Sequence, residues 1–334
     1  MRPSEGRGDM RRRDFIVAIA GLPVPSVAFA QPANKPVIGF MHPGTARANA
    51  HLVRAFESGL SDAGFLPDKN ITIEYRWADD NYDRLPSIAD ELVAKRVSVL
   101  AVGTPIAVIA AKRATSSIPI VFSMGGDPLR GGLVASLSHP GGNVTGATFF
   151  SNVLTAKRFA LLSELVPNAK VFGALVNPKN ANAKMQTGEA EDAARSLSKR
   201  LVVVQAVGES EFESAFGQLK NTGVEALIVL SDAVLNAHAR QIAKLALSQS
   251  LPTCFAYREP VDVGGLISYG AHNRTDTMRQ AAVYAGRILK GEKPADLPVQ
   301  QPSKFELVIN MKTAKALNLT IPNSMQLLAD EVIE

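Results

Sequence analysis

Cysteine and aromatic residues are scarce in this chain of 334 residues. The single cysteine, Cys254, cannot form an internal disulfide and excludes a metal site built from several thiolates. Aromatic residues make up 6% of the chain, with one tryptophan, Trp77, which argues against the stacking surfaces that bind single-stranded nucleic acid. The five histidines lack the spacing of metal ligands. We therefore expect neither a metal site nor a cofactor.

The chain also lacks blocks of like charge and long hydrophobic runs. The net charge is +5, but Lys and Arg are interspersed with acidic residues, so the charge favours solubility rather than nucleic-acid binding. The apolar run 15–22 is much shorter than the roughly 20 residues that cross a membrane. With 46% apolar residues, a chain of this length can form two domains with buried cores.

The first 30 residues have the pattern of an export signal. A basic segment ending at Arg13 precedes the short apolar run, and Ala28-Phe29-Ala30 supplies the small residues found before a cleavage site. We expect a signal peptide over residues 1–30, starting at Met1 or Met10, cleavage near Ala30, and a periplasmic mature protein. Residues 12–16 also resemble the twin-arginine export pattern, except that an arginine stands where Ser or Thr is usual, so both export routes remain open.

Short runs of β-branched and apolar residues recur from residue 37 onward. Most are continuous stretches of Val, Ile, Leu and Phe, as expected of strands covered on both faces. Amphipathic segments of helical length lie between them, and 52–63, 84–95, 157–165 and 237–248 are the clearest. This alternation predicts βαβ units and parallel sheets. The predicted strands are Val37–Met41, Ile71–Trp77, Val97–Val102, Ile118–Ser123, Val144–Phe149, Val171–Val176, Leu201–Val207, Ala226–Leu230, Thr253–Tyr257, Gly265–Tyr269 and Phe305–Ile309.

The number of predicted strands is too large for one compact doubly wound sheet with such short connections. We therefore predict an α/β fold of two doubly wound, Rossmann-like lobes. Three segments rich in Gly or Pro, 139–143, 261–265 and 294–302, are interpreted as crossings that form a three-segment hinge, although each by itself also suits a surface loop. The predicted division assigns 36–146 and 265–298 to lobe 1, and 147–262 and 303–334 to lobe 2.

Six segments of the chain together form a distinctive pattern. They are Gly125-Gly126-Asp127-Pro128, Ser138–Gly146, Gly264–Gly270, Ala295–Pro302, Lys304–Asn310 and Ala329–Glu334. Together they resemble the ABC transporter substrate-binding protein family whose better-known members handle tryptophan or tyrosine, over nearly all of residues 36–334. The resemblance implies a type I periplasmic binding fold, a small-molecule ligand, and the permease subunits of an ATP-driven importer as partners. It does not identify the solute.

Parallel sheets of this kind bind ligands beyond the carboxyl ends of their strands, where helix N-termini offer free N–H groups. Thr104 has the clearest rationale at such an end, because Gly103 permits close approach of the backbone and Pro105 suits a first helical turn. The Thr104 hydroxyl either binds a carboxylate or caps the helix. The predicted ligand-binding residues are Gly44, Thr45, Gly103, Thr104, Pro105, Gly126, Asp127, Asn177, Ser231, Asp232, Tyr257 and Arg258.

Several of these residues also suit purely structural roles. Asp127 and Asp232, as a pair from facing lobes, suit an ammonium group, but each also suits a turn or cap. Asn177 either donates to the ligand or ends its strand in a turn. Tyr257 and Arg258 either cover the ligand at closure or join the two lobes. The sequence leaves these alternatives open.

The favoured function is a monomeric periplasmic substrate-binding protein of an ABC importer, which captures an amino acid or a small carboxylate by hinge closure and is not an enzyme. An exported two-lobe enzyme with Asp127 and Asp232 as acid and base is an alternative. No nucleophile motif or cofactor loop accompanies these residues. The ligand-sensing domain of a receptor is a second alternative, although no helix-turn-helix motif precedes residue 36.

Overall fold

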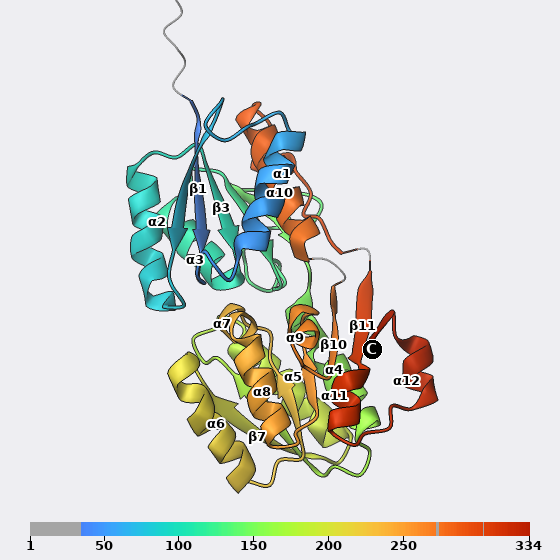
Figure 1. Ribbon diagram of the computed structural model, residues 1–334. Helices are drawn as coiled ribbons and strands as arrows, with labels where there is room; N and C mark the ends of the chain where they lie inside the picture. Colours follow the sequence, from blue (N-terminus) through green and yellow to red (C-terminus); the bar gives the residue numbers. More distant parts are fainter. Residues whose placement is uncertain (1–34, 272–273, 303) are drawn as a thin grey trace, which may run out of the picture. The chain divides into compact units, whose positions relative to one another are not determined.

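The computed structural model describes residues 35–271, 274–302 and 304–334 (Figure 1). The predicted export signal, residues 1–30, lies outside the described residues. Within the described part of the chain, no helix has the length and apolar character needed to span a bilayer.

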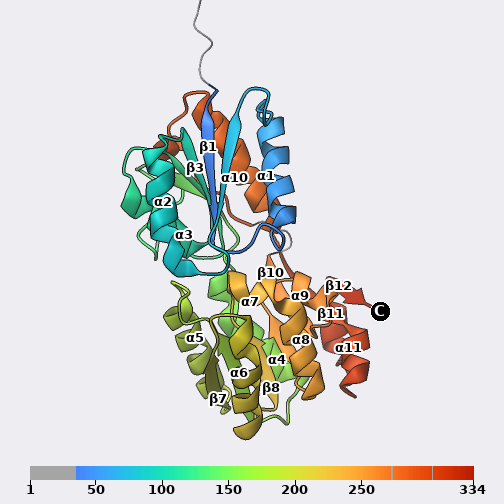
Figure 2. The same ribbon diagram turned by 60° about the vertical axis from the view of Figure 1, so that its left-hand side comes forward.

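The first sheet has five parallel strands in the order β2-β1-β3-β4-β5. Helices α1 and α10 lie side by side on one face, and α2 and α3 cover the other (Figures 1 and 2). Burial on both faces explains the continuous apolar sequence of the inner strands. We call this sheet and its helices the first lobe. Its elements are β1 (Val37–His42), α1 (Ala50–Asp62), β2 (Thr72–Trp77), α2 (Leu85–Ala94), β3 (Val99–Gly103), α3 (Pro105–Ala114), β4 (Ile120–Met124), β5 (Val144–Thr148) and α10 (Arg274–Leu289), with short 3₁₀ turns at Tyr82–Arg84 and Pro294–Asp296.

The second sheet has seven strands in the order β12-β11-β10-β9-β8-β6-β7. All neighbouring pairs are parallel except β10 and β11. Side chains of α4 and α5 fill one hydrophobic cluster against this sheet, and those of α6 and α8 fill another. This sheet and its helices form the second lobe. Its elements are α4 (Thr155–Leu165), β6 (Val171–Val176), α5 (Ala183–Ser196), β7 (Arg200–Gln205), α6 (Glu209–Asn221), β8 (Ala226–Val229), α7 (Ala233–Ala237), α8 (Ala239–Ser248), β9 (Thr253–Phe255), α9 (Glu259–Asp262), β10 (Ile267–Ala271), β11 (Phe305–Asn310), α11 (Met311–Ala316), α12 (Asn323–Leu328) and β12 (Glu331–Ile333), with a 3₁₀ turn at Ser151–Leu154.

The predicted two-lobed α/β fold is confirmed, but the predicted division between the lobes is wrong at one strand. Strand β10, assigned above to lobe 1, pairs with β9 and β11 in the second sheet. The Gly-rich segment 261–265 begins in the last two residues of the four-residue helix α9 and leads to β10, so it belongs to a short crossover within one sheet. The chain therefore returns to the first lobe between β10 and α10, not before β10.

The first predicted crossing is also displaced. Segment 139–143 precedes β5, which still belongs to the first sheet, so the chain changes lobe after β5. The Pro-rich segment lies between α10 and β11, as expected of the last crossing. There the backbone of Gln300 donates to Gly146 and accepts from Thr148, which ties this segment to β5.

Arg158 of α4 lies close to two of these crossings. Its side chain is fully buried. One terminal nitrogen, Nη2, donates to the carbonyl of Ser151 at 2.6 Å, and Nη1 donates to the carbonyl of Tyr269 at 3.3 Å. Because Ser151 follows β5 and Tyr269 belongs to β10, this arginine links the segments that connect the second lobe to the first.

Helices α1 and α10 touch closely because Gly59 has no side chain. A Cβ at Gly59 would lie 2.3 Å from the carbonyl oxygen of Arg279 and 2.8 Å from the Cβ of Ala282. Backbone atoms cannot yield by rotamer change, so a methyl group here must push the helices apart. By contrast, Gly217 in α6 has open space around its would-be Cβ.

Gly59→Ala should therefore lower the free energy of unfolding by about 1–3 kcal/mol, the usual cost of overpacking. Gly217→Ala is the matched control and should raise it by about 0.5–1 kcal/mol, because alanine is the better helix former. Urea denaturation of both variants measures the two effects. A neutral Gly59→Ala would contradict the close packing of α1 on α10.

Candidate ligand-binding site

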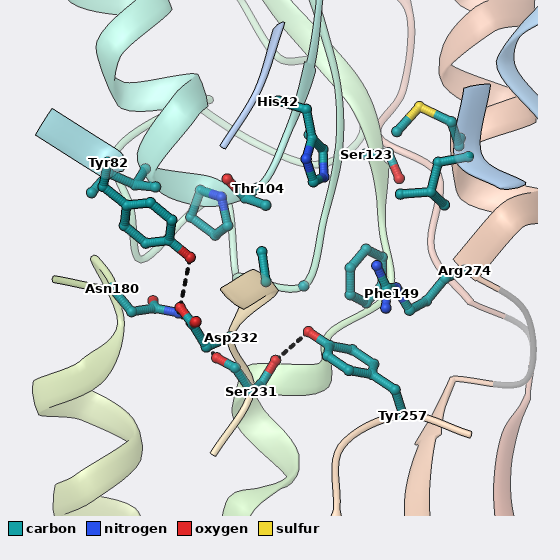
Figure 3. A pocket seen from close by; sticks show the side chains of 17 residues that line it. His42, Tyr82, Thr104, Ser123, Phe149, Asn180, Ser231, Asp232, Tyr257 and Arg274 are labelled. Carbon is teal, nitrogen blue, oxygen red and sulfur yellow. Dashed lines mark hydrogen bonds between the residues drawn. The ribbon is translucent and has the colours of Figure 1, made fainter. Parts of the chain in front are cut away.

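A cavity lies between the carboxyl ends of the strands of the two sheets (Figure 3). Its volume is about 40 Å³, room for only a few water molecules. The last residues of β1 and β3 line it, together with residues that follow β2, β4, β5, β6, β8 and β9 and residues of α1, α3 and α10. The lining residues are His42, Leu52, Tyr82, Gly103, Thr104, Pro105, Ile106, Ser123, Gly125, Phe149, Asn180, Ser231, Asp232, Ala233, Tyr257, Arg274 and Met278.

His42 ends β1 and is buried, with 2% of its surface exposed. The backbone N–H of Gly44 donates to its Nδ1 at 3.0 Å, so the proton of the neutral ring lies on Nε2. Burial, followed by the charge of Arg274, lowers the pKa of His42 to about 3. His42 is therefore a neutral donor at the cavity wall across the physiological pH range.

Thr104 precedes α3 in a strained backbone conformation. Its φ is 83° and its ψ is 148°, a region that residues other than glycine rarely occupy. Its hydroxyl makes no capping hydrogen bond to the helix, and Oγ1 is buried without a partner. A strained residue with an unsatisfied hydroxyl facing a cavity suggests a binding role, since such strain concentrates at ligand sites.

Arg274 begins α10 and is the guanidinium among the described residues that line the cavity. Its side chain is 12% exposed. Its guanidinium lies over the ring of Tyr257 at 4.3 Å from the centroid, and 5.7 Å from that of Phe149 (Figure 3). Nη1 lies 3.3 Å from Glu259, whose side chain is 40% exposed, but the buried Nε has no hydrogen-bond partner. The two rings hold a guanidinium whose donors are not all used.

Asp232 is buried at the end of β8, and donors surround it. Its Oδ1 accepts the N–H groups of Val234 and Leu235, at 2.9 and 3.1 Å, and the amide of Asn177 at 3.2 Å. Its Oδ2 accepts the Tyr82 hydroxyl and the Asn180 amide, each at 2.8 Å. Asp232 thus caps α7 and orders its neighbours at the same time.

Several contacts cross the cleft and hold the lobes together. Tyr82 of the first lobe donates to Asp232 of the second. At the rim, Lys179 lies 2.5 Å from Asp83. The imidazole of His238 lies 3.4 Å from Asp80, and this hydrogen bond raises the pKa of the histidine. The lobes are therefore closed on each other in this structure.

The structure brings half of the sequence-predicted residues to the cavity. Its wall includes Gly103, Thr104, Pro105, Ser231, Asp232 and Tyr257. The hydroxyl of Ser231 hydrogen-bonds to that of Tyr257 across neighbouring strand ends (Figure 3). The binding roles of these residues remain predictions. The predicted residues that do not line the cavity are Gly44, Thr45, Gly126, Asp127, Asn177 and Arg258.

The residues away from the cavity have other partners. Asp127 accepts from the N–H groups of Leu129 and Arg130, which is the turn considered as its alternative. Asn177 orients Asp232. Arg258 pairs with Glu331 and Asp262. Trp77 packs on Phe40 and His42.

Sequence reasoning missed several polar and aromatic residues of the wall, and their local sequence carries little signal. Tyr82 lies in a 3₁₀ turn, and Asn180 lies in the loop after β6. By contrast, Ser123 and Phe149 end predicted strands and His42 directly follows one, so the strand-end rule could have included all three. The missed residues are His42, Tyr82, Ser123, Phe149, Asn180 and Arg274.

Two largely parallel sheets that meet at the carboxyl ends of their parallel strands, with a cavity between them, define a type I periplasmic binding fold. Over residues 12–333 the chain matches the family described as ABC transporter substrate binding protein, and it belongs to that family. It is a substrate-binding protein and not an enzyme. Among the described residues, no group of three or more His, Cys, Asp and Glu side chains is placed to hold a metal ion.

Two of the known proteins similar to this chain are described with an amino acid. A tyrosine-binding protein of Clostridioides difficile (strain R20291) is 29% identical over 279 residues, which cover 83% of this chain and 78% of the relative. An ABC domain from Streptococcus pneumonia in complex with L-Trp is 25% identical, with a TM-score of 0.78 over 90% of this chain and 100% of the other.

A third relative is a substrate-binding protein with adhesive properties from Clostridium difficile, in a ligand-free, open structure. It is also 25% identical, over 89% of this chain and 99% of the other, but its TM-score is 0.61. At equal identity, this chain therefore superposes better on the complex than on the open structure. That difference agrees with the contacts across the cleft.

Thr104→Gly should raise the free energy of unfolding relative to Thr104→Ala by about 2 kcal/mol, because only glycine relieves the strained backbone. At an ordinary N-cap glycine is also preferred to alanine, but by less than about 1 kcal/mol, so the strain shows as the excess over that preference. Both variants lose the hydroxyl, so their difference isolates the backbone. Urea denaturation measures it, and an alanine variant more stable than the glycine variant would contradict the strain at Thr104.

The contact between His238 and Asp80 should make stability depend on pH. Because this contact raises the pKa of His238 above its ordinary value of 6.5, it stabilises the folded protein fully below pH 6.5. The stabilisation is lost as the pH rises through the raised pKa. Asp80 and, at longer range, Glu209 are the acidic groups acting on this histidine.

His238→Gln should therefore lower the free energy of unfolding more at pH 6 than at pH 8.5, as measured by urea denaturation at both values. His139→Gln is the control, because His139 is exposed and contacts only nearby residues of its own loop. Its effect should be the same at both pH values. A pH-independent effect of His238→Gln would show that the histidine stays neutral in the closed protein.

Proposed function

We propose that this chain is the extracytoplasmic solute-binding component of an ABC importer, and that it captures an amino acid or a small carboxylate between its lobes. Membership of the family supports the transport role. The predicted signal peptide, cleaved near Ala30, supports a periplasmic location. Permease subunits in the membrane are the expected partners, and the mature chain acts as a monomer.

The proposed ligand class rests on one observation. The Nε of Arg274, a residue that lines the cavity, has no hydrogen-bond partner. A buried guanidinium with unused donors favours an anion, because charge-assisted hydrogen bonds to a carboxylate replace the lost hydration. Thr104 and the first two residues of α3, Pro105 and Ile106, line the same cavity. The first N–H groups of α3 have no acceptor within the helix, and the helix dipole adds favourable charge.

Closure of the lobes completes this site. The first lobe supplies Thr104 and His42 together with Arg274, and the second lobe supplies Ser231 and Tyr257. A solute that contacts both sets stabilises the closed form by its differential affinity, and contacts such as that between Tyr82 and Asp232 add to it. The closed protein then presents a different surface to the permease from the open one.

Arg274→Ala should weaken binding of the solute at least about thirtyfold, the effect of removing one partner of a buried charge pair. Calorimetric titration of the mature chain with carboxylates and amino acids measures this. Arg279→Ala is the matched control on the same helix, where the exposed arginine pairs with Asp62. Equal affinity of the two variants would remove Arg274 from the site.

A further inference from the structure

The polar atoms that face the cavity with unused hydrogen-bonding capacity are mainly donors. The neutral ring of His42 has its proton on Nε2 because Nδ1 already accepts from Gly44. Arg274 has the unpartnered Nε–H, and the Thr104 hydroxyl is unpartnered as well. Each of these donors lies in the first lobe's part of the wall. The two N–H groups can only donate, so a ligand that satisfies them must supply acceptors, whereas the Thr104 hydroxyl can donate or accept.

The acceptors of the wall are largely occupied. Asp232, the one carboxylate among the described lining residues, already accepts five hydrogen bonds. The side-chain oxygen of Asn180 accepts from the backbone of Asn182 at 2.9 Å. The Ser231 hydroxyl is shared between Ser151 and Tyr257. An ammonium group brings three donors and no acceptor, so it would compete for oxygens that are already in use.

Most of the rest of the wall is apolar, and the hydroxyl of Ser123 is already bonded to that of Thr277. Leu52, Pro105, Ile106 and Met278 approach from the first lobe, and the ring of Phe149 lies beside the guanidinium of Arg274. Such side chains stabilise an apolar body and leave a buried ammonium without solvent or partners.

We propose that the solute is a carboxylate with an apolar body and no ammonium group, so that the site discriminates against amino acids. This inference rests on the proposed function and selects between its two ligand classes. Arg274, Thr104 and His42 hold the carboxylate. The hydrogen bond from Tyr82 to Asp232 excludes the ammonium by occupying the carboxylate that would otherwise pair with it.

Matched pairs of ligands that differ only in the α-ammonium test the inference. Calorimetric titration of the mature chain compares 4-methylpentanoate with L-leucine and 3-phenylpropionate with L-phenylalanine, and the two corresponding amides serve as uncharged controls. The acid should bind at least tenfold more tightly than its amino acid in a pair that binds, and the amides should bind weakly. An amino acid that binds as tightly as its acid would overturn the inference and leave the proposed function standing. Binding of the amides with no binding of any acid or amino acid would overturn both.

Tyr82→Phe tests the mechanism of exclusion. Removing the hydroxyl frees one lone pair of Asp232, so the preference for the acid over the amino acid should fall several-fold, whatever happens to absolute affinity. Tyr75→Phe is the matched control, because the Tyr75 hydroxyl bonds to Glu57 away from the cavity. An unchanged preference in Tyr82→Phe would contradict the role given to Asp232.

Discussion

The closed arrangement of the two lobes depends on the carboxylate of Asp232. A buried carboxylate is stable only where donors replace its water, and five donors do so here. Four of them come from the second lobe and one, the hydroxyl of Tyr82, comes from the first. Separating the lobes removes that donor and admits water in its place. Closure therefore supplies the fifth hydrogen-bond donor to a carboxylate that is already buried at the end of β8.

Two arginines illustrate how burial separates a structural role from a binding role. Arg158 is fully enclosed, and its terminal nitrogens donate to backbone carbonyls of segments that join the lobes. Arg274 lies at the cavity beside two aromatic rings, and its acidic partner among the described residues is partly exposed Glu259. Burial lowers the pKa of Arg158. The backbone carbonyls that accept its hydrogen bonds stabilise the charged form of its side chain. At Arg274 the remaining donors are available to a solute.

Much of the fold was predictable because strand and helix patterns are local. Each predicted strand matches one of β1 to β11, since continuous Val, Ile and Leu runs mark strands buried on both faces. Strand β12 was missed because it has three residues, too few for a pattern. The lobe boundary was misplaced at β10 because a glycine-rich stretch marks a change of chain direction equally well within a lobe and between lobes. Only the pairing of β10 with β9 distinguishes the two.

The sequence by itself determined the class of fold, the family and the edge of the sheets where ligands bind, because burial periodicity and strand ends are readable one segment at a time. It pointed to Thr104 and Asp232 for the same reason. Only the tertiary structure decided what those residues do. Tyr82 reaches Asp232 across 150 positions of sequence, and Arg274 meets Tyr257 from another lobe. Such partners are selected by packing over long range, which no local pattern records.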